Sequence, residues 1–444
     1  MKQLIGTGQR AKTGWLALAA ATVFMAVMAS FSTPAQAYQS PWGQGESDPN
    51  DLVISLATFS PGDDVPSWFG HTGLVVEDRR LNVSRMYNYG MFNFDRDMLM
   101  RFAMGRLWFW VAPTSVSHTY GIYESLDRDI RVIELYLPPQ RRAEVAEFLA
   151  DNVRPENKEY LYHHYDDNCA TRVRDVIDLA VGGQFFEAYG EKPARLTLRG
   201  HTRRHSAHMP PMDWLLMFLM NGSIDTPSTV WDEMFLPGEL ERRVLEFQWV
   251  DDEGEVHDLA LRNHEVYRAQ NRGPVPEEPP THWYWWLLVG TSIGAVGLLI
   301  GWNSRRRPGR SSRVGYGAYH IVMGLLLGGP GLLLGVMAVG TEHTVTYWNL
   351  NLFWANPLSL GALILGVMVL RGSVTARRRL VRWWSLLAII AAVGVVVSLV
   401  GLIYAPLYQD TSLPAALFLP IIAGSAACSW LVDGALVRQE PEGE

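Results

Sequence analysis

The strongest constraint on this 444-residue chain is an abrupt change of character after Pro279-Pro280. Five apolar segments follow, and each is near the roughly 20 residues that a helix needs to cross a bilayer. They are residues 283–302, 316–340, 352–370, 383–404 and 413–436. The chain before them is charged, aromatic and mixed in pattern, and it is long enough to bury one substantial core. The sequence therefore predicts a folded domain followed by an α-helical bundle of about five transmembrane helices, residues 282–437.

The loops between the apolar segments differ sharply in charge. Arginines follow the first and the third segment, at Arg305, Arg306, Arg307, Arg310 and Arg313 and at Arg371, Arg377, Arg378, Arg379 and Arg382. The loops 341–350 and 405–412 contain no lysine or arginine. Arginine-rich loops stay on the cytoplasmic side. We therefore expect these loops and the tail 438–444 in the cytoplasm, and the domain before the bundle outside it.

The N-terminus carries an export signal. Lys2, Arg10 and Lys12 precede an apolar run over 15–31, and Ala35-Gln36-Ala37 forms a small-x-small cleavage site. The apolar run is also nearly long enough to span a bilayer, so an uncleaved anchor is the alternative. Residues 1–37 are thus predicted to be a signal peptide or an N-terminal anchor, and residues 38–281 an extracytoplasmic domain.

Cys169 is the first candidate for chemistry in that domain. The only other cysteine, Cys428, lies in the last apolar segment, so an exported Cys169 has no obvious disulfide partner. Apolar residues recur at helical spacing after it and end at Gly182-Gly183, while Asp167 or Asn168 can cap the helix start. A cysteine in the first helical turn lies where the helix dipole favours a thiolate, so we predict a lowered pKa for Cys169. The free N–H groups there can also stabilise an oxyanion.

A thiol nucleophile needs a base and a residue that orients the base. His71 begins a β-branched and apolar run typical of a strand, and we choose it as the base. Asn88, on a second predicted strand over 85–89, is our orienting residue, with Tyr87 and Tyr89 as competitors. The rival histidines are His118, His163, His164, His201, His205 and His208.

Other patterns place the remaining elements of the domain. We predict strands over 51–59 and 130–137 and a helix over 140–152. The segment 99–111 is too apolar for an ordinary surface helix. It is either a core helix or a surface that dips into the bilayer.

The order of a histidine on a strand and then a distant Asn-Cys at a helix start resembles circularly permuted papain-like enzymes of the NlpC and lecithin:retinol acyltransferase type. More specifically, the domain resembles the Lnb-type bacterial lipoprotein N-acyltransferases. The residues that carry this resemblance are Phe69-Gly70-His71, 87–94, Pro155-Glu156-Asn157, Tyr162 with 165–175, and Met234-Phe235-Leu236-Pro237, and in the helical part 343–352 with Asn356-Pro357-Leu358. The expected fold is α+β: a permuted papain-like, NlpC-type extracytoplasmic domain before a transmembrane bundle.

The resemblance implies a two-step acyl transfer. Cys169, activated by His71, would take an acyl chain from a membrane phospholipid as a thioester. The free α-amine of a diacylated lipoprotein would then accept the chain. The implied location is the bacterial inner membrane, with the catalytic domain on the periplasmic side. The partners are the phospholipid donor, the lipoprotein acceptor and the bilayer, and no nucleic acid is implied. No metal-ligand spacing or nucleotide-binding glycine loop appears, so we expect no metal and no cofactor.

Further residues are candidates for substrate binding. They are Tyr87, Tyr89, Tyr165, Asn168, His343 and Asn349. His343 and Asn349 share an external loop, where they could contact a lipid headgroup or the acceptor's amine; Glu342 adds a possible acceptor for an ammonium group. Arg203 and Arg204 either hold a lipid phosphate or form a solvated basic loop.

Two other functions are compatible with the residues. The same thiol–imidazole pair cleaves amides, so a membrane-tethered cysteine peptidase or amidase acting on cell-wall peptides is the main alternative. A catalytically idle scaffold that only binds lipid or lipoprotein is the second. The number of predicted spans favours acyl transfer, because one anchor suffices for tethering.

Overall fold

The computed structural model describes residues 40–93 and 96–436, so the predicted signal segment 1–37 and the tail 438–444 lie outside the described residues. The chain forms two compact units. We call the part up to Lys192 together with Thr229–Gly273 the sheet unit, and Pro193–Ser228 together with everything from Pro274 on the helical unit. The predicted domain 38–281 includes residues of both units, because Pro193–Ser228 groups with the helices.

The sheet unit is built on one seven-stranded antiparallel sheet. Its strand order is β6-β4-β3-β2-β1-β5-β9. The strands are β1 (Leu52–Phe59), β2 (His71–Asp78), β3 (Val83–Met91), β4 (Trp108–Thr114), β5 (Ile130–Leu135), β6 (Glu159–Leu161) and β9 (Ala260–Tyr267). The strands that we predicted from alternation and β-branched runs correspond to β1, β2, β3 and β5, and β3 pairs with β2 as expected. The predicted α+β class is confirmed.

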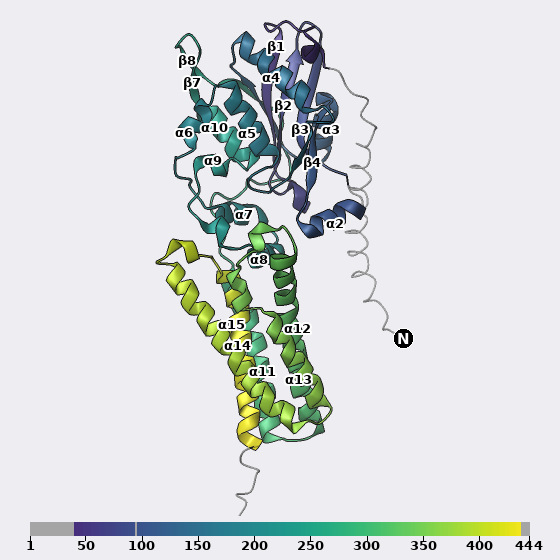
Figure 1. Cartoon of the computed structure of the whole chain (residues 1–444), viewed down its shortest axis with the longest axis vertical. Coiled ribbons are helices and arrows are strands. Elements are labelled where there is room, and N and C mark those ends of the chain that lie inside the picture. The colour runs from purple at the N-terminus through teal and green to yellow at the C-terminus, as the bar shows by residue number, and fades with distance from the viewer. Residues whose placement is uncertain (1–39, 94–95, 437–444) are drawn as a thin grey trace, which may run out of the picture. The chain divides into compact units, whose positions relative to one another are not determined.

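Helices cover both faces of the sheet. On one face α4 (Pro139–Asn152), α5 (Cys169–Ala180) and α10 (Pro237–Glu246) pack on the apolar side chains of the central strands. On the other face α3 (Val116–Ser125) covers a smaller core that includes Phe59. Figure 1 shows α5 and α10 on one side of the strands and α3 on the other. The unit is completed by short elements: η1 (Pro41–Gln44), η2 (Val65–Ser67), α6 (Gln184–Tyr189), α9 (Val230–Glu233), β7 (Gln248–Val250) and β8 (Val256–Asp258).

The segment 99–111 is not a core helix. It forms the end of α2 (Arg96–Met104) and the start of β4, and several of its large apolar side chains are exposed. The expectation of a buried helix is therefore wrong, because α2 ends at Met104 and leaves Leu99, Met100 and Phe102 exposed. The alternative, a surface that meets the bilayer, is taken up below.

The helical unit contains four helices long and apolar enough to cross a membrane. They are α11 (Trp283–Arg306), α12 (Arg310–Gly340), α14 (Val374–Gly401) and α15 (Ser412–Leu436). Two shorter helices, α7 (Leu198–Ser206) and α8 (Pro210–Leu219), and the turn η3 (Gly222–Asp225) belong to the same unit. Trp214 of α8 packs its ring 5.4 Å from that of Phe418 and donates to the carbonyl of Leu413. These contacts explain why Pro193–Ser228 groups with the helices.

Glycines let the long helices approach closely. A Cβ at Gly294 would lie 2.5 Å from the carbonyl oxygen of Pro420, and one at Gly301 would lie 2.9 Å from the Cα of Cys428. Such small-residue contacts are how helices pack in a bilayer, where no hydrophobic driving force acts between them. A Cβ at Gly372 would lie 3.3 Å from Nη1 of Arg313. The two arginine loops are thus neighbours, as a shared cytoplasmic side requires.

The third predicted span, 352–370, is not one helix. Its second half is the eleven-residue α13 (Leu360–Leu370), and the turns η4 (Thr344–Thr346), η5 (Leu350–Phe353) and η6 (Pro357–Ser359) precede it. The two helical pieces of this region meet at a bend of 47°. Asn356 caps η6 and Pro357 has no N–H to continue a ladder, so the chain breaks there. The bundle accordingly has four spans, or five if this broken pair crosses the membrane.

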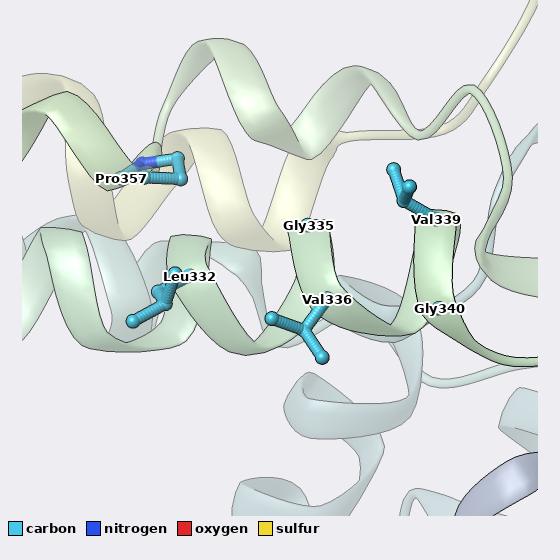
Figure 2. Close-up of a pocket in the computed structure, with 6 residues that line it drawn as sticks. All are labelled: Leu332, Gly335, Val336, Val339, Gly340 and Pro357. Atoms are coloured by element: carbon cyan, nitrogen blue, oxygen red, sulfur yellow. The ribbon is translucent and has the colours of Figure 1, made fainter.

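A shallow apolar pocket of about 310 Å³ lies beside this break. Figure 2 shows the six residues that line it, Leu332, Gly335, Val336, Val339, Gly340 and Pro357. None of these side chains carries a titratable or nucleophilic group. This pocket therefore offers contact for hydrocarbon and no chemistry, and the reactive residues lie elsewhere.

Candidate active site

The first helical residue of α5 is Cys169, and its position is fixed by a capping box. Asn168 has extended backbone geometry, and its side-chain oxygen accepts from the N–H groups of Ala170 (2.8 Å) and Thr171 (3.0 Å). The Thr171 hydroxyl accepts from the Asn168 N–H in return, at 2.8 Å. This reciprocal pair satisfies the otherwise unpaired donors of the first turn. The predicted helix start at Asn168 is thus confirmed, and Cys169 lies in its first turn.

The sulfur of Cys169 faces the beginning of β2. The backbone N–H groups of Thr72, Ala170 and Cys169 itself donate to it when it is charged. Thr72 directly follows His71, so the helix start and the histidine strand meet at the sulfur. On the neighbouring strand, a Cβ at Gly90 would lie 3.8 Å from the Cβ of Cys169. A glycine at this position therefore keeps the space beside the thiol open.

His71, the chosen base, is oriented by Asn88. The Nε2 atom of His71 lies 3.1 Å from Oδ1 of Asn88. The amide of Asn88 donates through Nδ2 to Oγ1 of Thr114 on β4, which fixes the side of the amide that faces the histidine. With its oxygen toward the ring, Asn88 selects the tautomer that carries the proton on Nε2. The Nδ1 atom is then the basic nitrogen.

Two aromatic rings that stack on each other lie beside the imidazole. Phe59 stacks on it at a centroid distance of 5.9 Å and Tyr123 at 6.1 Å. Burial lowers the pKa of His71 to about 4; the hydrogen bond to Asn88 opposes this shift and the charge of Arg128 adds to it. The histidine is therefore neutral at physiological pH. A neutral imidazole is the form that can accept a proton.

The Cys169 thiol is protonated in this environment. Burial raises its pKa to about 11, although the three backbone N–H groups and the charge of Arg128 act in the opposite direction. The predicted lowered pKa is therefore wrong for the resting protein. Desolvation disfavours the thiolate by more than the helix start favours it. The resting pair is a neutral thiol and a neutral imidazole.

Arg128 is a residue of the site that the sequence did not reveal. Its side chain is buried, its Nε donates to the carbonyl of Ser60 at 2.6 Å, and its guanidinium lies 4.6 Å from the ring centre of Tyr123. Its positive charge lowers the pKa of both Cys169 and His71. Thr114 was missed as well. Thr114 and Arg128 come from a strand and a turn that are distant in sequence from Cys169 and His71, and no local pattern marks either residue.

Two family models match the chain on either side of the boundary at Pro279-Pro280. The Lnb N-terminal periplasmic domain matches residues 38–201, and the Lnb transmembrane domain matches residues 280–429. This chain is an Lnb-type protein. It is a multi-pass membrane protein with a periplasmic domain, and the Lnb domains indicate a role in lipoprotein processing. No curated protein and no solved structure matches the chain.

The rival histidines of this Lnb-type protein have other surroundings. The ring of His163 pairs with Asp166 at 2.9 Å, and that of His164 packs edge-on against Phe69 at 4.4 Å. His118 lies on exposed turns of α3. His201, His205 and His208 belong to the helical unit, where His201 is buried and its Nδ1 contacts Arg204 at 3.0 Å. Among the described histidines, His71 alone has its ring hydrogen-bonded to Asn88.

The candidate substrate residues of the sheet unit act mainly as structure. Tyr87 accepts a hydrogen bond from the Trp42 indole at 2.8 Å, and Tyr89 donates to Asn152 at 2.6 Å. Both tyrosines are buried. They point to the opposite face of β3 from Asn88, because successive side chains alternate. They therefore cannot replace Asn88 as the orienting residue.

Tyr165 and Asn168 belong to the segment that leads to the nucleophile. Tyr165 is buried, with its ring 5.1 Å from that of Phe235. The amide nitrogen of Asn168 donates to the carbonyls of His164 (2.7 Å) and Phe235 (3.0 Å), in addition to the cap formed by its oxygen. All hydrogen-bonding groups of the Asn168 side chain are thus in use. Its contribution is to fix the loop that presents Cys169.

The candidates in the helical unit have structural partners as well. Asn349 is buried and its amide nitrogen donates to the carbonyls of Phe218 and Leu219. His343 precedes the turn η4 and is half-buried. Arg203 and Arg204 are buried, and they donate to the carbonyls of Pro280 and Pro276. The expectation of a solvated basic loop is therefore wrong, and these arginines hold the chain that leads into α11.

Proposed function

We propose that this protein transfers an acyl chain from a membrane phospholipid, through a thioester on Cys169, to the α-amine of a diacylated lipoprotein. The observation that carries the proposal is the arrangement of three residues: a thiol at a capped helix start, a neutral histidine on the adjoining strand and an asparagine that orients the histidine. This is the constellation that nucleophilic acyl transfer requires. The Lnb match gives the context of lipoprotein processing.

In the first step Cys169 attacks the ester carbonyl of the phospholipid. Because the resting thiol and imidazole are both neutral, His71 Nδ1 takes the thiol proton as the sulfur attacks. The carbonyl oxygen becomes an oxyanion, which backbone N–H groups at the start of α5 can stabilise. When the intermediate collapses, the ester C–O bond breaks and the imidazolium protonates the departing glycerol oxygen. The products are an acyl thioester and a lysophospholipid.

The second step returns the enzyme to its starting state. The uncharged α-amine of the lipoprotein attacks the thioester carbonyl and loses a proton to His71. The C–S bond then breaks, and the departing sulfur recovers that proton from the imidazolium. The acyl chain ends as an amide on the lipoprotein N-terminus. These steps need only the residues named here, and an amine acceptor in the bacterial inner membrane would meet the donor there.

The test is to trap the acyl-enzyme. Full-length purified protein is incubated with a phospholipid, and intact mass with peptide mapping locates any adduct. We expect an acyl chain on Cys169, and we expect none in Cys169→Ser or His71→Ala. The matched control is Cys428→Ser, which removes the other cysteine, lies in the helical unit and should leave the adduct in place.

The acceptor is tested next by adding a diacylated lipopeptide to the acylated protein. Loss of the adduct together with a triacylated lipopeptide supports the complete reaction. Release of free fatty acid alone would indicate a hydrolase. No adduct, combined with cleavage of cell-wall peptides, would favour the peptidase. Full biological activity of Cys169→Ala would favour the scaffold.

A further inference from the structure

The helix α2 exposes four large apolar side chains, whereas α4, α5, α6 and α10 of the same unit expose one each. Met100 is 67% exposed, Phe102 53% and Leu99 51%, and Met104 is exposed as well. A soluble surface rarely keeps several such side chains in one short segment. Within the described structure, Leu99, Met100 and Phe102 each leave at least half of their surface exposed. This surface therefore needs an apolar partner outside the unit.

The apolar surface continues from α2 into the sheet. Trp108, at the start of β4, is 49% exposed, and Leu161 of β6 is 45% exposed. The two residues are directly paired across neighbouring strands. We call Leu99, Met100, Phe102, Met104, Trp108 and Leu161 the α2 surface. Arg101 and Arg106 are exposed among these residues and Asp97 is exposed in the first turn of α2, so the surface combines apolar side chains with a net positive charge.

This surface is joined to the active site by short stretches of chain. The segment α2 connects β3, which carries Asn88, to β4, which ends at Thr114. Behind it, stacked rings form a row: Phe92 lies 4.9 Å from Phe109, and Phe109 lies 4.5 Å from Tyr162. Besides burial, a charged Cys169 raises the pKa of Tyr162, so this row of rings ends near the nucleophile.

We propose that the α2 surface docks on a bilayer containing anionic phospholipids, so that donor lipids enter the active site along the row of rings. Apolar side chains mixed with arginines are typical of segments that lie in the membrane interface, where the arginines contact lipid phosphates. The membrane spans of the same chain keep this domain at a bilayer. The docking of the surface stands on its exposed residues, whereas the role in lipid entry rests on the proposed function.

The docking is tested on the full-length protein in nanodiscs of phosphatidylethanolamine and phosphatidylglycerol. Met100→Cys is labelled with a bimane fluorophore in a Cys169→Ser, Cys428→Ser background, and nitroxide-labelled lipids serve as quenchers. The matched control is Val256→Cys, because Val256 on β8 is an exposed apolar residue (63%) of the same unit outside the α2 surface. We expect quenching at Met100 and little at Val256. Equal quenching at the two positions would overturn the proposal.

A second measurement concerns lipid entry. In Leu99→Asp, Phe102→Asp we expect acylation of Cys169 by bilayer phospholipid to fall roughly 10-fold, because less apolar area inserts. Acylation by a monomeric short-chain phospholipid should stay within about twofold, since that donor reaches the site from water. An equal fall for both donors would indicate a folding defect and overturn the entry role.

The outcomes separate this inference from the proposed function. The quenching experiment contains no Cys169, so it reports docking whether or not the protein transfers acyl chains. Quenching without any thioester in the unsubstituted protein would reject the acyl transfer and keep the membrane surface. A disulfide-linked dimer of the unlabelled Met100→Cys protein, together with a label at this position that is not quenched, would replace the bilayer with self-association.

Discussion

Two clusters of buried polar side chains, one in each unit, show what separates a reactive site from a structural one. In the sheet unit, His71 bonds Asn88 through one ring nitrogen, and its other nitrogen is left for a proton. In the helical unit, Asn349 uses both ends of its amide: it donates to Phe218 and Leu219 and accepts from Asn351 and Gln409. The first cluster keeps a position open for chemistry. In the second, the amide of Asn349 is fully occupied by its partners.

The two clusters should also differ in how much the fold is destabilised when one of their side chains is removed. Asn349 and Asn351 supply donors to the carbonyls at the end of α8, which would otherwise be buried without partners. Their removal should therefore destabilise the fold. A half-buried thiol beside a neutral histidine contributes little to stability, and its removal should affect only the reaction. The predictions below test this contrast, from the largest expected effect to the smallest.

The largest effect should come from Cys169→Ala. We expect acyl transfer to fall at least about 10³-fold, because the covalent intermediate can no longer form. Thermal unfolding of the sheet unit should change little, since the substitution removes one sulfur from a half-buried position. Transfer to a lipopeptide and unfolding by circular dichroism are the two measurements. If Cys169→Ala lost its fold together with its activity, Cys169 would be a structural residue like Asn349, and the contrast between the two clusters would fail.

Asn88→Ala should lower the rate by about 10- to 100-fold, because a histidine that is free to turn is poorly placed for proton transfer. The matched control is Thr114→Val, which removes the second partner of the Asn88 amide and should have a weaker effect of the same kind. Single-turnover acylation of Cys169 measures both. A rate for Asn88→Ala equal to that of the parent protein would leave His71 without an orienting residue and exclude this triad.

The contrast also explains what the sequence could predict. Cys169, His71 and Asn88 were proposed from local signals: a capping residue before apolar residues at helical spacing, a β-branched and apolar run after His71, and a plausible second strand over 85–89. Thr114 and Arg128 were not found, since they meet the site only through long-range contacts in the folded domain. The pKa of Cys169 was predicted in the wrong direction because the position in the helix is visible in the sequence, but burial is not.

The helical unit shows the same limit. Four of its spans followed from length and hydropathy alone. The break near Asn356-Pro357 had a local signal, but a long apolar run concealed it. The grouping of Pro193–Ser228 with the helices had no signal, since it depends on partners such as Trp214 with Phe418, about 200 residues apart. Asn349, read as a substrate residue from its loop, gained its structural role from such a contact.

Asn349→Leu should destabilise the helical unit by about 1–3 kcal/mol, because the carbonyl of Leu219 and the backbone N–H of Asn351 lose the partners that Asn349 supplies. The two cysteines allow each unit to be followed separately: Cys428 is buried in the helical unit and Cys169 lies in the sheet unit. A thiol-reactive dye during heating should show earlier exposure of Cys428 and unchanged exposure of Cys169. Asn303→Leu, at an exposed position of α11, is the matched control and should change neither.

The pH dependence of the thiol tests the electrostatics of the sheet unit. In Cys428→Ala, alkylation of Cys169 by iodoacetamide should rise with a midpoint at about pH 11, because burial disfavours the thiolate. In the pH–rate profile of acylation, the acid limb, where the rate falls as the pH drops, should lie at about pH 4. Above that value His71 keeps its neutral, basic form. The His71 shift also makes stability fall as pH drops from about 6.5 to about 4, where only the unfolded histidine takes up a proton. A plateau of alkylation by about pH 7 would instead indicate the lowered pKa that the helix start alone predicts.

The smallest effect should come from Arg128→Gln, and it separates electrostatics from packing. The guanidinium lowers the pKa of both His71 and Cys169, so its removal should move the acid limb of acylation upward and slow alkylation at fixed pH by a few-fold. Arg128→Lys retains the charge and should restore the position of the limb. If Arg128 served only to pack against Tyr123 and to bond Ser60, both variants would lower the rate without moving the limb. The position of the limb in the two variants therefore decides whether this buried charge belongs to the reactive cluster or, like Asn349, to the scaffold.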